Sequence, residues 1–262
     1  MSDPDAVPAR SLSFDAAEPL PLTGERTAPG VPEENYWFQR HVAGYLFAAD
    51  RVAGTRVLDA GCGEGYGTEL LAARATAVHA LDLEWPVVAR ARARYPRTGF
   101  GAGNLVAMPF AAGTFDAVVS LQVIEHLHTP QEFLAECKRV LRPGGLILVS
   151  TPNRLTFSPE GVRNPFHTFE FAPEELHATM ARHFTGIELL GTFHGPSIRS
   201  LERFMRVSFP ERLIQTPAYE WPDWLQSRVA RVRPGDFRVR ARALERSLDL
   251  VAVARAPSSP RA

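Results

Sequence analysis

The sequence predicts an α/β protein in which a mostly parallel sheet is covered by helices on both faces. Short apolar, β-forming segments alternate with helix-compatible segments along most of the chain, and parallel strands need such crossover helices between them. The first of these strands runs straight into a glycine-rich turn and then a helix, because residues 56–68 are RVLDAGCGEGYGT. Glycine permits positive φ and the close approach of a ligand to bare main chain. We therefore expect a ligand site at the carboxyl end of this strand.

Length and composition favour one such domain with an elaboration. The chain has 262 residues, 45% of them hydrophobic, and its 29 basic residues balance 29 acidic ones. Zero net charge gives no overall attraction to nucleic acid or to an anionic membrane. The two cysteines, Cys62 and Cys137, do not form a disulfide framework, which is typical of a cytoplasmic protein. No apolar run is long enough to span a membrane.

The N-terminal part of the chain is predicted to contain a tail and a helix. Residues 1–30 are rich in proline, alanine and acids, so we predict a mobile tail. A helix is predicted over Glu33–Ala53, where five residues share one face: Trp37, Val42, Tyr45, Leu46 and Ala49. Tyr36 and its aromatic neighbour are expected in the core. Arg40 and His41 stand beside them, just before the ligand strand, so Arg40 is a candidate for ligand binding.

The following strands and helices continue the alternation. The further strands are predicted at Ala77–Leu83, Arg97–Asn104, Thr114–Leu121 and Leu146–Thr151, with a helix–strand unit over Pro173–Phe193. Pro86 begins the helix after the second strand, at a position where proline is tolerated. Residues 129–132 (TPQE) are predicted as a capping box that opens another helix. Residues 142–145 (RPGG) are expected to end that helix.

The alternation breaks between Pro196 and Arg246. This stretch holds two tryptophans and many arginines without strand periodicity, so we predict a mostly helical insertion that caps the site, with its arginines in solvent. Leu248–Ala254 is predicted as a last strand that returns to the sheet. The chain then divides into four parts: a tail (1–30), a core (31–195), a helical insertion or cap (196–247), and the final strand of the core with a C-terminal tail (248–262).

The glycine turn does not match the common nucleotide-binding patterns. A dinucleotide fingerprint needs G-x-G-x-x-G, and the third glycine is missing in every frame of Gly61, Gly63, Gly65 and Gly67. No Gly-Lys-Ser/Thr follows, which excludes a phosphate-binding P-loop. Asp59, just before the turn, would repel a pyrophosphate but attract an ammonium or sulfonium group. The turn therefore predicts a cationic ligand.

Several motifs now resemble one family in the correct order. VLDAGCGEGYG, ALDL, a polar residue at Asn104, FDAVVSLQVIEHL and VLRPGG resemble the class I S-adenosylmethionine-dependent methyltransferases, from about Val57 to Thr151. The resemblance implies a Rossmann-like, seven-stranded, mostly parallel sheet whose last strand is antiparallel. It also implies that S-adenosylmethionine binds across the carboxyl ends of the first strands, as open α/β sheets predict.

The resemblance further implies roles for single residues. Gly61 and Gly63 would let the backbone approach the methionine part of the cofactor, and Asp59 would order this turn and the cofactor's amino group. Asp82 would accept both ribose hydroxyls, since a carboxylate has two acceptor oxygens. Asn104 would contact the adenine, although the family often has Asp there. The predicted cofactor-binding residues are Arg40, Asp59, Gly61, Cys62, Gly63, Asp82, Leu83, Asn104, Leu105 and Gln122.

The candidate catalytic residues lie after two of the predicted strands: Glu125 and His126 after the fourth, and His167 after the fifth. Methyl transfer to a hydroxyl needs a positioned nucleophile and a base, and histidine has a pKa near neutral pH. We predict Glu125, His126 and His167 as catalytic, and His128 at the surface. Residues 122–126 (QVIEH) are similar to the E-x-x-E-H pattern of metal-dependent ubiquinone O-methyltransferases and small-RNA 2′-O-methyltransferases. Gln122 replaces the first acid with a neutral, weaker ligand, so we predict no metal, while a divalent ion at Glu125 and His126 stays open as the alternative.

A narrower resemblance concerns the acceptor. Residues 150–171 (STPNRLTFSPEGVRNPFHTFEF) form a polar loop at a place where loops usually carry substrate recognition. With ENYWFQRH (34–41), FHG (193–195) and SLDLVAVAR (247–255), this loop resembles the mycofactocin oligosaccharide methyltransferases of actinobacteria. The resemblance implies O-methylation of a glucose unit on the oligosaccharide of a peptide-derived redox cofactor, so that a glycoside is the small-molecule partner.

Two other functions stay open. One is O-methylation of a quinone, a lipid or another small metabolite. The other is a non-catalytic protein that keeps a vestigial cofactor site. The intact glycine turn, Asp59 and Asp82 argue against such a loss of function. Nucleic-acid methylation is disfavoured, because TPNR stands where an N-P-P-Y/F signature would follow the fifth strand and no basic stripe dominates. The sequence does not predict the oligomeric state.

Overall fold

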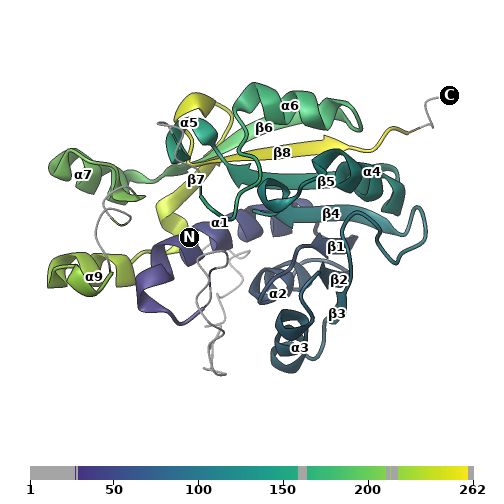
Figure 1. Ribbon diagram of the computed structural model, residues 1–262, viewed down its shortest axis with the longest axis horizontal. Helices are drawn as coiled ribbons and strands as arrows, with labels where there is room; N and C mark the ends of the chain where they lie inside the picture. Colours follow the sequence, from purple (N-terminus) through teal and green to yellow (C-terminus); the bar gives the residue numbers. More distant parts are fainter. Residues whose placement is uncertain (1–26, 28, 159–163, 211–212, 214–217, 259–262) are drawn as a thin grey trace, which may run out of the picture.

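The computed structural model describes residues 27, 29–158, 164–210, 213 and 218–258. They form one eight-stranded sheet in the order β3-β2-β1-β4-β5-β8-β6-β7 (Figure 1). The strands are β1 (Arg56–Ala60), β2 (Ala77–Asp82), β3 (Gly99–Ala102), β4 (Phe115–Leu121), β5 (Leu141–Pro152), β6 (Thr185–His194), β7 (Phe237–Arg240) and β8 (Asp249–Arg255). Strands β1 to β5 are parallel, and β8 is antiparallel to β5 and β6. This confirms the predicted α/β fold. The predicted tail, residues 1–30, lies almost wholly outside the described residues.

The sheet has one strand more than the seven that we expected. Strand β7 belongs to the insertion and pairs antiparallel with β6, from Gly191 opposite Arg240 to His194 opposite Phe237. Its four residues, FRVR, are too few to show the alternation that identifies a strand. The insertion, predicted as mostly helical, therefore also contributes a strand that was not predicted, while the antiparallel β8 was predicted correctly.

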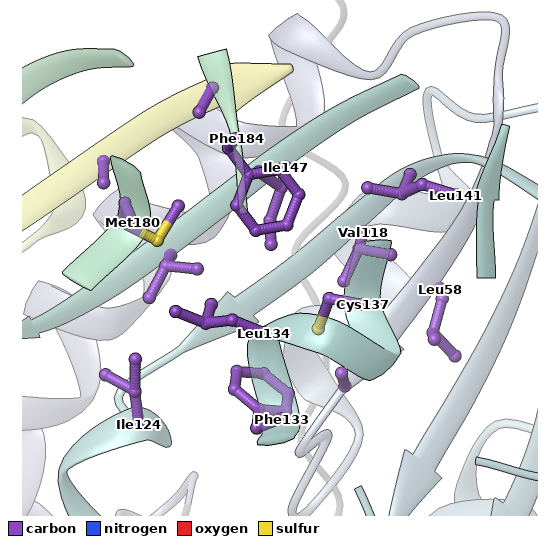
Figure 2. Close-up of a cluster of buried hydrophobic side chains, with 14 of the residues drawn as sticks. Leu58, Val118, Ile124, Phe133, Leu134, Cys137, Leu141, Ile147, Met180 and Phe184 are labelled. Carbon is purple, nitrogen blue, oxygen red and sulfur yellow. The ribbon is translucent and has the colours of Figure 1, made fainter. Parts of the chain in front are cut away.

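Neighbouring residues of the central strands serve two opposite hydrophobic cores, because side chains alternate along a strand. On one face, three strand residues pack with α4 (Pro130–Val140) and α6 (Pro173–Ala181): Leu58, Val118 and Ile147. Figure 2 shows this core, with the side chains of α4 beside those of the strands. On the other face, the neighbouring strand residues pack with α1 (Asn35–Arg51) and α2 (Tyr66–Ala72): Val57, Val119 and Leu148. Helix α3 (Trp85–Arg94) begins within one residue of the predicted Pro86.

Three local predictions are corrected. Leu46 is 43% exposed, because the buried stripe of α1 runs through Phe38, Val42, Tyr45 and Ala49 instead. Thr129 precedes α4 as expected, but its side chain makes no capping bond. Its backbone carbonyl accepts from the backbone N–H groups of residues 132 and 133. Strand β5 already starts at Leu141, since the RPGG segment forms an irregularity within the β4–β5 pairing rather than a gap before the strand.

The insertion packs on the start of α1. It contains α7 (Pro196–Met205), η3 (Ala218–Glu220), α9 (Asp223–Ala230), η4 (Pro234–Asp236) and β7. Its apolar side chains form a separate cluster with Tyr36, which is fully buried as predicted: Ile198, Phe209, Leu213, Trp221, Leu225, Val229, Val232 and Phe237. In Figure 1, α7 and α9 lie at the left end of the molecule. None of the described helices has the length and apolar character needed to cross a membrane.

Candidate functional site

The glycine turn after β1 folds over the end of β2. The backbone N–H groups of Gly61 and Cys62 donate to the Leu81 carbonyl, with N–O distances of 2.7 and 3.2 Å. The Gly63 N–H donates to Oδ2 of Asp82 at 2.8 Å. Gly63 has φ +48°, and a Cβ atom built on it would meet no atom within 4 Å. At Gly63 the chain therefore presents bare backbone to an open space, which fits a bound ligand at this position.

The other glycines of the turn have packing roles. A Cβ on Gly61 would lie 2.4 Å from Cγ2 of Val123, and one on Gly67 would lie 2.1 Å from the ring of Tyr45. Gly67 therefore allows α2 to pack directly on α1. Gly65, with φ +78°, is the residue before α2, and its Cβ would lie 2.9 Å from the Phe100 ring. The sequence pattern did not separate these packing positions from Gly63, which faces open space.

Asp59 joins the two helices that cover this strand. It is completely buried. Its Oδ1 accepts from the Tyr45 hydroxyl at 3.2 Å, and its Oδ2 accepts from the Thr68 hydroxyl at 2.6 Å. Burial raises the pKa of Asp59 to about 7. The carboxyl group therefore holds α1 and α2 against β1, and its predicted contact with the cofactor's amino group stays a prediction.

A pocket opens beside the turn. It is lined by Gly61, Cys62, Gly63, Gln122 and residues of the N-terminal part of the chain: Thr27, His41, Tyr45 and Tyr66 among them. His41 Nδ1 lies 3.2 Å from both the Thr27 hydroxyl and the Tyr66 hydroxyl. Burial lowers the pKa of His41 to about 4, so the imidazole is neutral. Thr27 and Tyr66 were missed as site residues, although Tyr66 stands inside the glycine motif.

The predicted ribose and adenine contacts lie at the ends of β2 and β3, which are parallel neighbours. Asp82 is half-buried, and its Oδ1 accepts from the Glu84 N–H at 3.2 Å. Leu83 is 70% exposed, whereas Leu105 is buried in the main core. Asn104 is exposed, and its Oδ1 accepts from the Val106 N–H at 3.0 Å. The carboxyl ends of parallel neighbours meet at one edge of a sheet, where open α/β sheets bind ligands.

Gln122 and Arg40 both line a second, small cavity, together with Ser150 and Asp249. Gln122 has φ +58°, which is uncommon for a residue with a side chain. Its Nε2 donates to the Ser150 hydroxyl at 3.1 Å. Arg40 is buried and donates through Nε to Oδ2 of Asp249 at 2.8 Å and through Nη2 to the Leu248 carbonyl at 2.9 Å. Arg40 thus has structural partners that the sequence did not indicate, and its predicted contact with the cofactor stays a prediction.

The three predicted catalytic residues come together. Glu125 and His126 belong to η2 (Ile124–His126), and His167 lies in the loop before α6. One potential ligand atom from each residue lies within 4.8 Å of the others. The rings of His126 and His167 are 5.0 Å apart between centroids. The loop is fixed to η2 because the Thr168 N–H and hydroxyl both donate to the Glu125 carbonyl, at 2.8 and 2.9 Å.

The cluster contains one buried acid, Glu125, and contacts a second, Glu170. Glu125 is 1% exposed, and burial raises its pKa to about 8. His167 Nδ1 lies 2.8 Å from Oε1 of Glu170, which is also 1% exposed. Oε2 of Glu125 and Oε2 of Glu170 are buried without a hydrogen-bond partner among the described residues. Glu170 was predicted only as part of the polar loop, although its spacing of three residues from His167 was visible. His128 is exposed, as expected.

Other polar residues of the loop serve the fold. Asn153 is completely buried, and its Nδ2 donates to the carbonyls of Leu244 and Ser247 at 2.9 and 3.0 Å. Arg154 forms an ion pair with Glu175 of α6, with a distance of 2.9 Å between Nη2 and Oε1. Residues 159–163 of the predicted loop lie outside the described residues. Both described parts of the loop contact the cluster: the ring centroid of Phe157 lies 5.4 Å from that of His167, and Thr168 donates to the Glu125 carbonyl.

Comparisons with known proteins agree with this geometry. Residues 58–149 match a family model described as a methyltransferase domain. The chain is 46% identical over 268 aligned residues to a probable S-adenosylmethionine-dependent methyltransferase of Mycolicibacterium smegmatis, covering 98% of this chain and all of that protein. It is 42% identical to a protein of the same description from Mycobacterium tuberculosis, covering 97% and 95% of the two chains.

More distant matches cover less of the chain or only its fold. A ubiquinone biosynthesis O-methyltransferase of Caulobacter vibrioides is 37% identical over 106 residues, which are 38% of this chain and 42% of that protein. The crystal structure of a methyltransferase from Thermotoga maritima, described as a possible histamine N-methyltransferase, has a TM-score of 0.58 at 18% identity and covers 85% of this chain and 94% of its own. At this identity the structural match shows the fold alone.

Proposed function

The chain belongs to the S-adenosylmethionine-dependent methyltransferases, with S-adenosylmethionine as its cofactor, and from this premise we propose that it methylates a sugar hydroxyl of a glycosylated small molecule. The observation that carries the proposal is the cluster of Glu125, His126 and His167. Methyl transfer to an alcohol oxygen requires that the hydroxyl group loses its proton. The cluster offers two imidazoles that can accept this proton. The mycofactocin oligosaccharide is the narrower candidate substrate.

Two aromatic side chains support a sugar as the acceptor. Phe166 and Phe169 flank His167 in the loop, and each is 39% exposed. Exposed aromatic rings next to polar groups suit sugars, because the rings pack against the C–H faces while the polar groups bind hydroxyls. The match to the Caulobacter quinone methyltransferase covers less than half of either chain, whereas the two mycobacterial relatives match almost throughout. Quinone methylation is therefore the second candidate.

The chain's own groups would perform two tasks. Gly63 and Asp82 would hold the cofactor, through bare backbone and through a carboxylate. His167, oriented by Glu170 at Nδ1, would accept the acceptor's hydroxyl proton at Nε2. S-adenosylmethionine supplies a methyl carbon with a good leaving group. The new C–O bond forms as the C–S bond breaks and its electron pair returns to sulfur, giving a methyl ether and S-adenosylhomocysteine.

Transfer of a labelled methyl group tests the proposal. The purified protein is incubated with labelled cofactor and with glucosides or with phenols of matched size. We expect label in the glucosides, at a rate well above that in the phenols. Labelled phenols with unlabelled glucosides would favour the quinone-type alternative. Cofactor binding without any labelled product, also in a metabolite extract, would favour a non-catalytic protein.

A further inference from the structure

Glu125, His126 and His167 have the composition of a metal site as well as of a base. The cluster offers one carboxylate and two imidazoles, from η2 and from the loop before α6, with ligand atoms within 4.8 Å of one another. Two histidines and one carboxylate are a common ligand set for first-row divalent ions. The first residue of the sequence motif, Gln122, is not needed for this set, because His167 supplies the third ligand.

The hydrogen bonds of both imidazoles orient them for this role. His126 Nδ1 lies 3.0 Å from the Phe166 carbonyl oxygen, and His167 Nδ1 lies 2.8 Å from Oε1 of Glu170. Both oxygens only accept, so each Nδ1 carries the proton and each Nε2 carries the lone pair. Metal-binding histidines are held in this way by a carbonyl or a carboxylate on their other nitrogen.

The carboxyl group of Glu125 suits the role of a cation ligand. Glu125 is 1% exposed, and its Oε2 has no hydrogen-bond partner among the described residues. A buried carboxylate oxygen without a partner is costly. A cation would supply that partner, and its charge would offset the burial of Glu170 behind His167. A proton on Glu125 would also reduce the penalty, so the two explanations need a direct test.

We propose that Glu125, His126 and His167 form a binding site for one first-row divalent cation such as Mn²⁺, Co²⁺ or Zn²⁺. Two imidazole ligands favour these ions over Mg²⁺ and Ca²⁺, which prefer oxygen. The site is pre-formed, because Thr168 fixes the loop to the backbone of Glu125. This proposal departs from the sequence-based expectation of no metal, which rested on the neutral Gln122.

The role of the cation rests on the proposed function. Three protein ligands leave coordination positions open to a hydroxyl of the acceptor. A bound cation would lower the pKa of an acceptor hydroxyl. Because Nε2 of His167 would then bind the cation, the hydroxyl proton would leave to water instead of to His167, and His167 would act as a ligand rather than as the base of the proposed function. The bonds made and broken at the methyl carbon are the same as without the cation.

Metal titration of the full chain tests the site without any turnover. The protein is stripped with a chelator, and Mn²⁺ binding is followed by electron paramagnetic resonance while Co²⁺ binding is followed by its visible absorption. We expect one equivalent of either ion. Glu125→Gln, His126→Ala and His167→Ala should each weaken binding at least tenfold, and Glu170→Gln by about 10–100-fold. His128→Ala, an exposed neighbour, is the matched control and should bind like the wild type.

Circular dichroism establishes that each variant is folded, and His167→Asn replaces His167→Ala if the latter is not. Absence of a stoichiometric site in the wild type, or unchanged binding in the three ligand variants, would overturn the proposal. The outcome is separable from the proposed function. Glucoside methylation by stripped protein that binds no cation would reject the metal and keep the sugar methyltransferase. A cation site in a protein that does not methylate glucosides would keep the metal site and reject the sugar methyltransferase.

Discussion

Arg40 of α1 and Asp249 of β8 form an ion pair in which neither side chain is more than 6% exposed. The pair joins the first long helix of the described chain to the last strand of its sheet, 209 positions apart. Arg40 Nε donates to Oδ2 of Asp249 at 2.8 Å, and its Nη2 also donates to Oδ1. Such a pair costs much to bury and even more to break, because one partner alone is left as an uncompensated charge.

Removing one partner of this pair should destabilise the fold. We expect Arg40→Met to lower the free energy of unfolding by about 3–5 kcal/mol, because Asp249 then stays buried without its cation. Urea denaturation measures the change. Arg40→Met combined with Asp249→Leu should recover most of the loss, since no charge is left buried. Wild-type stability of Arg40→Met would contradict a structural role and return Arg40 to the list of cofactor contacts.

Two glycines of the same motif should respond differently to alanine. Gly67→Ala should cost about 3 kcal/mol or more in stability, because its Cβ would lie 2.1 Å from the Tyr45 ring. Gly63→Ala should cost only about 1–2 kcal/mol, from its positive φ. Its Cβ would instead enter the space of the ligand, so the affinity for S-adenosylhomocysteine should fall at least tenfold. Calorimetry and urea denaturation on both variants separate the two effects.

Asp82 should be required for cofactor binding. Asp82→Ala removes the carboxylate at the end of β2 that is predicted to accept the ribose hydroxyls, and it also removes the acceptor of the Gly63 N–H. We expect the dissociation constant of S-adenosylhomocysteine to rise at least tenfold in calorimetric titration. Asp50→Asn, on the exposed side of α1, is the control. Unchanged affinity in Asp82→Ala would reject the assigned role.

The histidines of the cluster should affect turnover rather than cofactor affinity. We expect His126→Ala and His167→Ala each to lower kcat by about 10²–10⁴-fold, the usual range for loss of a positioned base or its equivalent. The affinity for S-adenosylhomocysteine should change less than threefold, because neither residue lines the pocket beside the glycine turn. Steady-state rates and calorimetry on the same preparations measure both quantities. Full activity in both variants would reject a role for the cluster in proton removal.

Asp59 should make stability depend on pH. Its pKa is about 7 in the folded protein and 3.8 as the ordinary value, so the folded state binds the proton more tightly than the unfolded state. The contribution of Asp59 is therefore complete below pH 3.8 and is lost as the pH rises toward 7. Relative to Asp59→Asn, the wild type should lose up to about 1.4 kcal/mol per pH unit in this window. A pH-independent difference in urea denaturation would contradict the raised pKa.

The sequence predicted the fold well where a pattern was long. Strands β2 and β4 and helix α4 have enough residues to show their period, and their positions agree with the structure to within two residues. The four residues of β7 do not show one, and this strand was missed. Leu46 satisfies a helical spacing but lies beside the buried stripe rather than in it, because spacing alone does not fix which face meets the sheet.

The site was predictable in its parts but not in its arrangement. Glu125 and His126 were found because they follow a strand that was identified correctly. Their contact with His167 depends on how the loop after β5 folds back, and Thr168 fixes this through the Glu125 carbonyl. The buried partners of Arg40 and Asp59 are far away in sequence or on the next helix. The motif along the chain therefore did not predict these protein partners, and the cofactor contacts that it predicts for both residues stay predictions.

The additional strand β7 determines which edge of the sheet is exposed to other copies of the protein. The outermost strands, β3 and β7, have only four residues each. Strand β7 carries two exposed arginines, Arg238 and Arg240, so a second chain that paired along this edge would meet like charges. Short, charged edges prevent the open-ended strand addition that leads to aggregation. The insertion therefore protects the longer strand β6, whose backbone would otherwise form the exposed edge of the sheet.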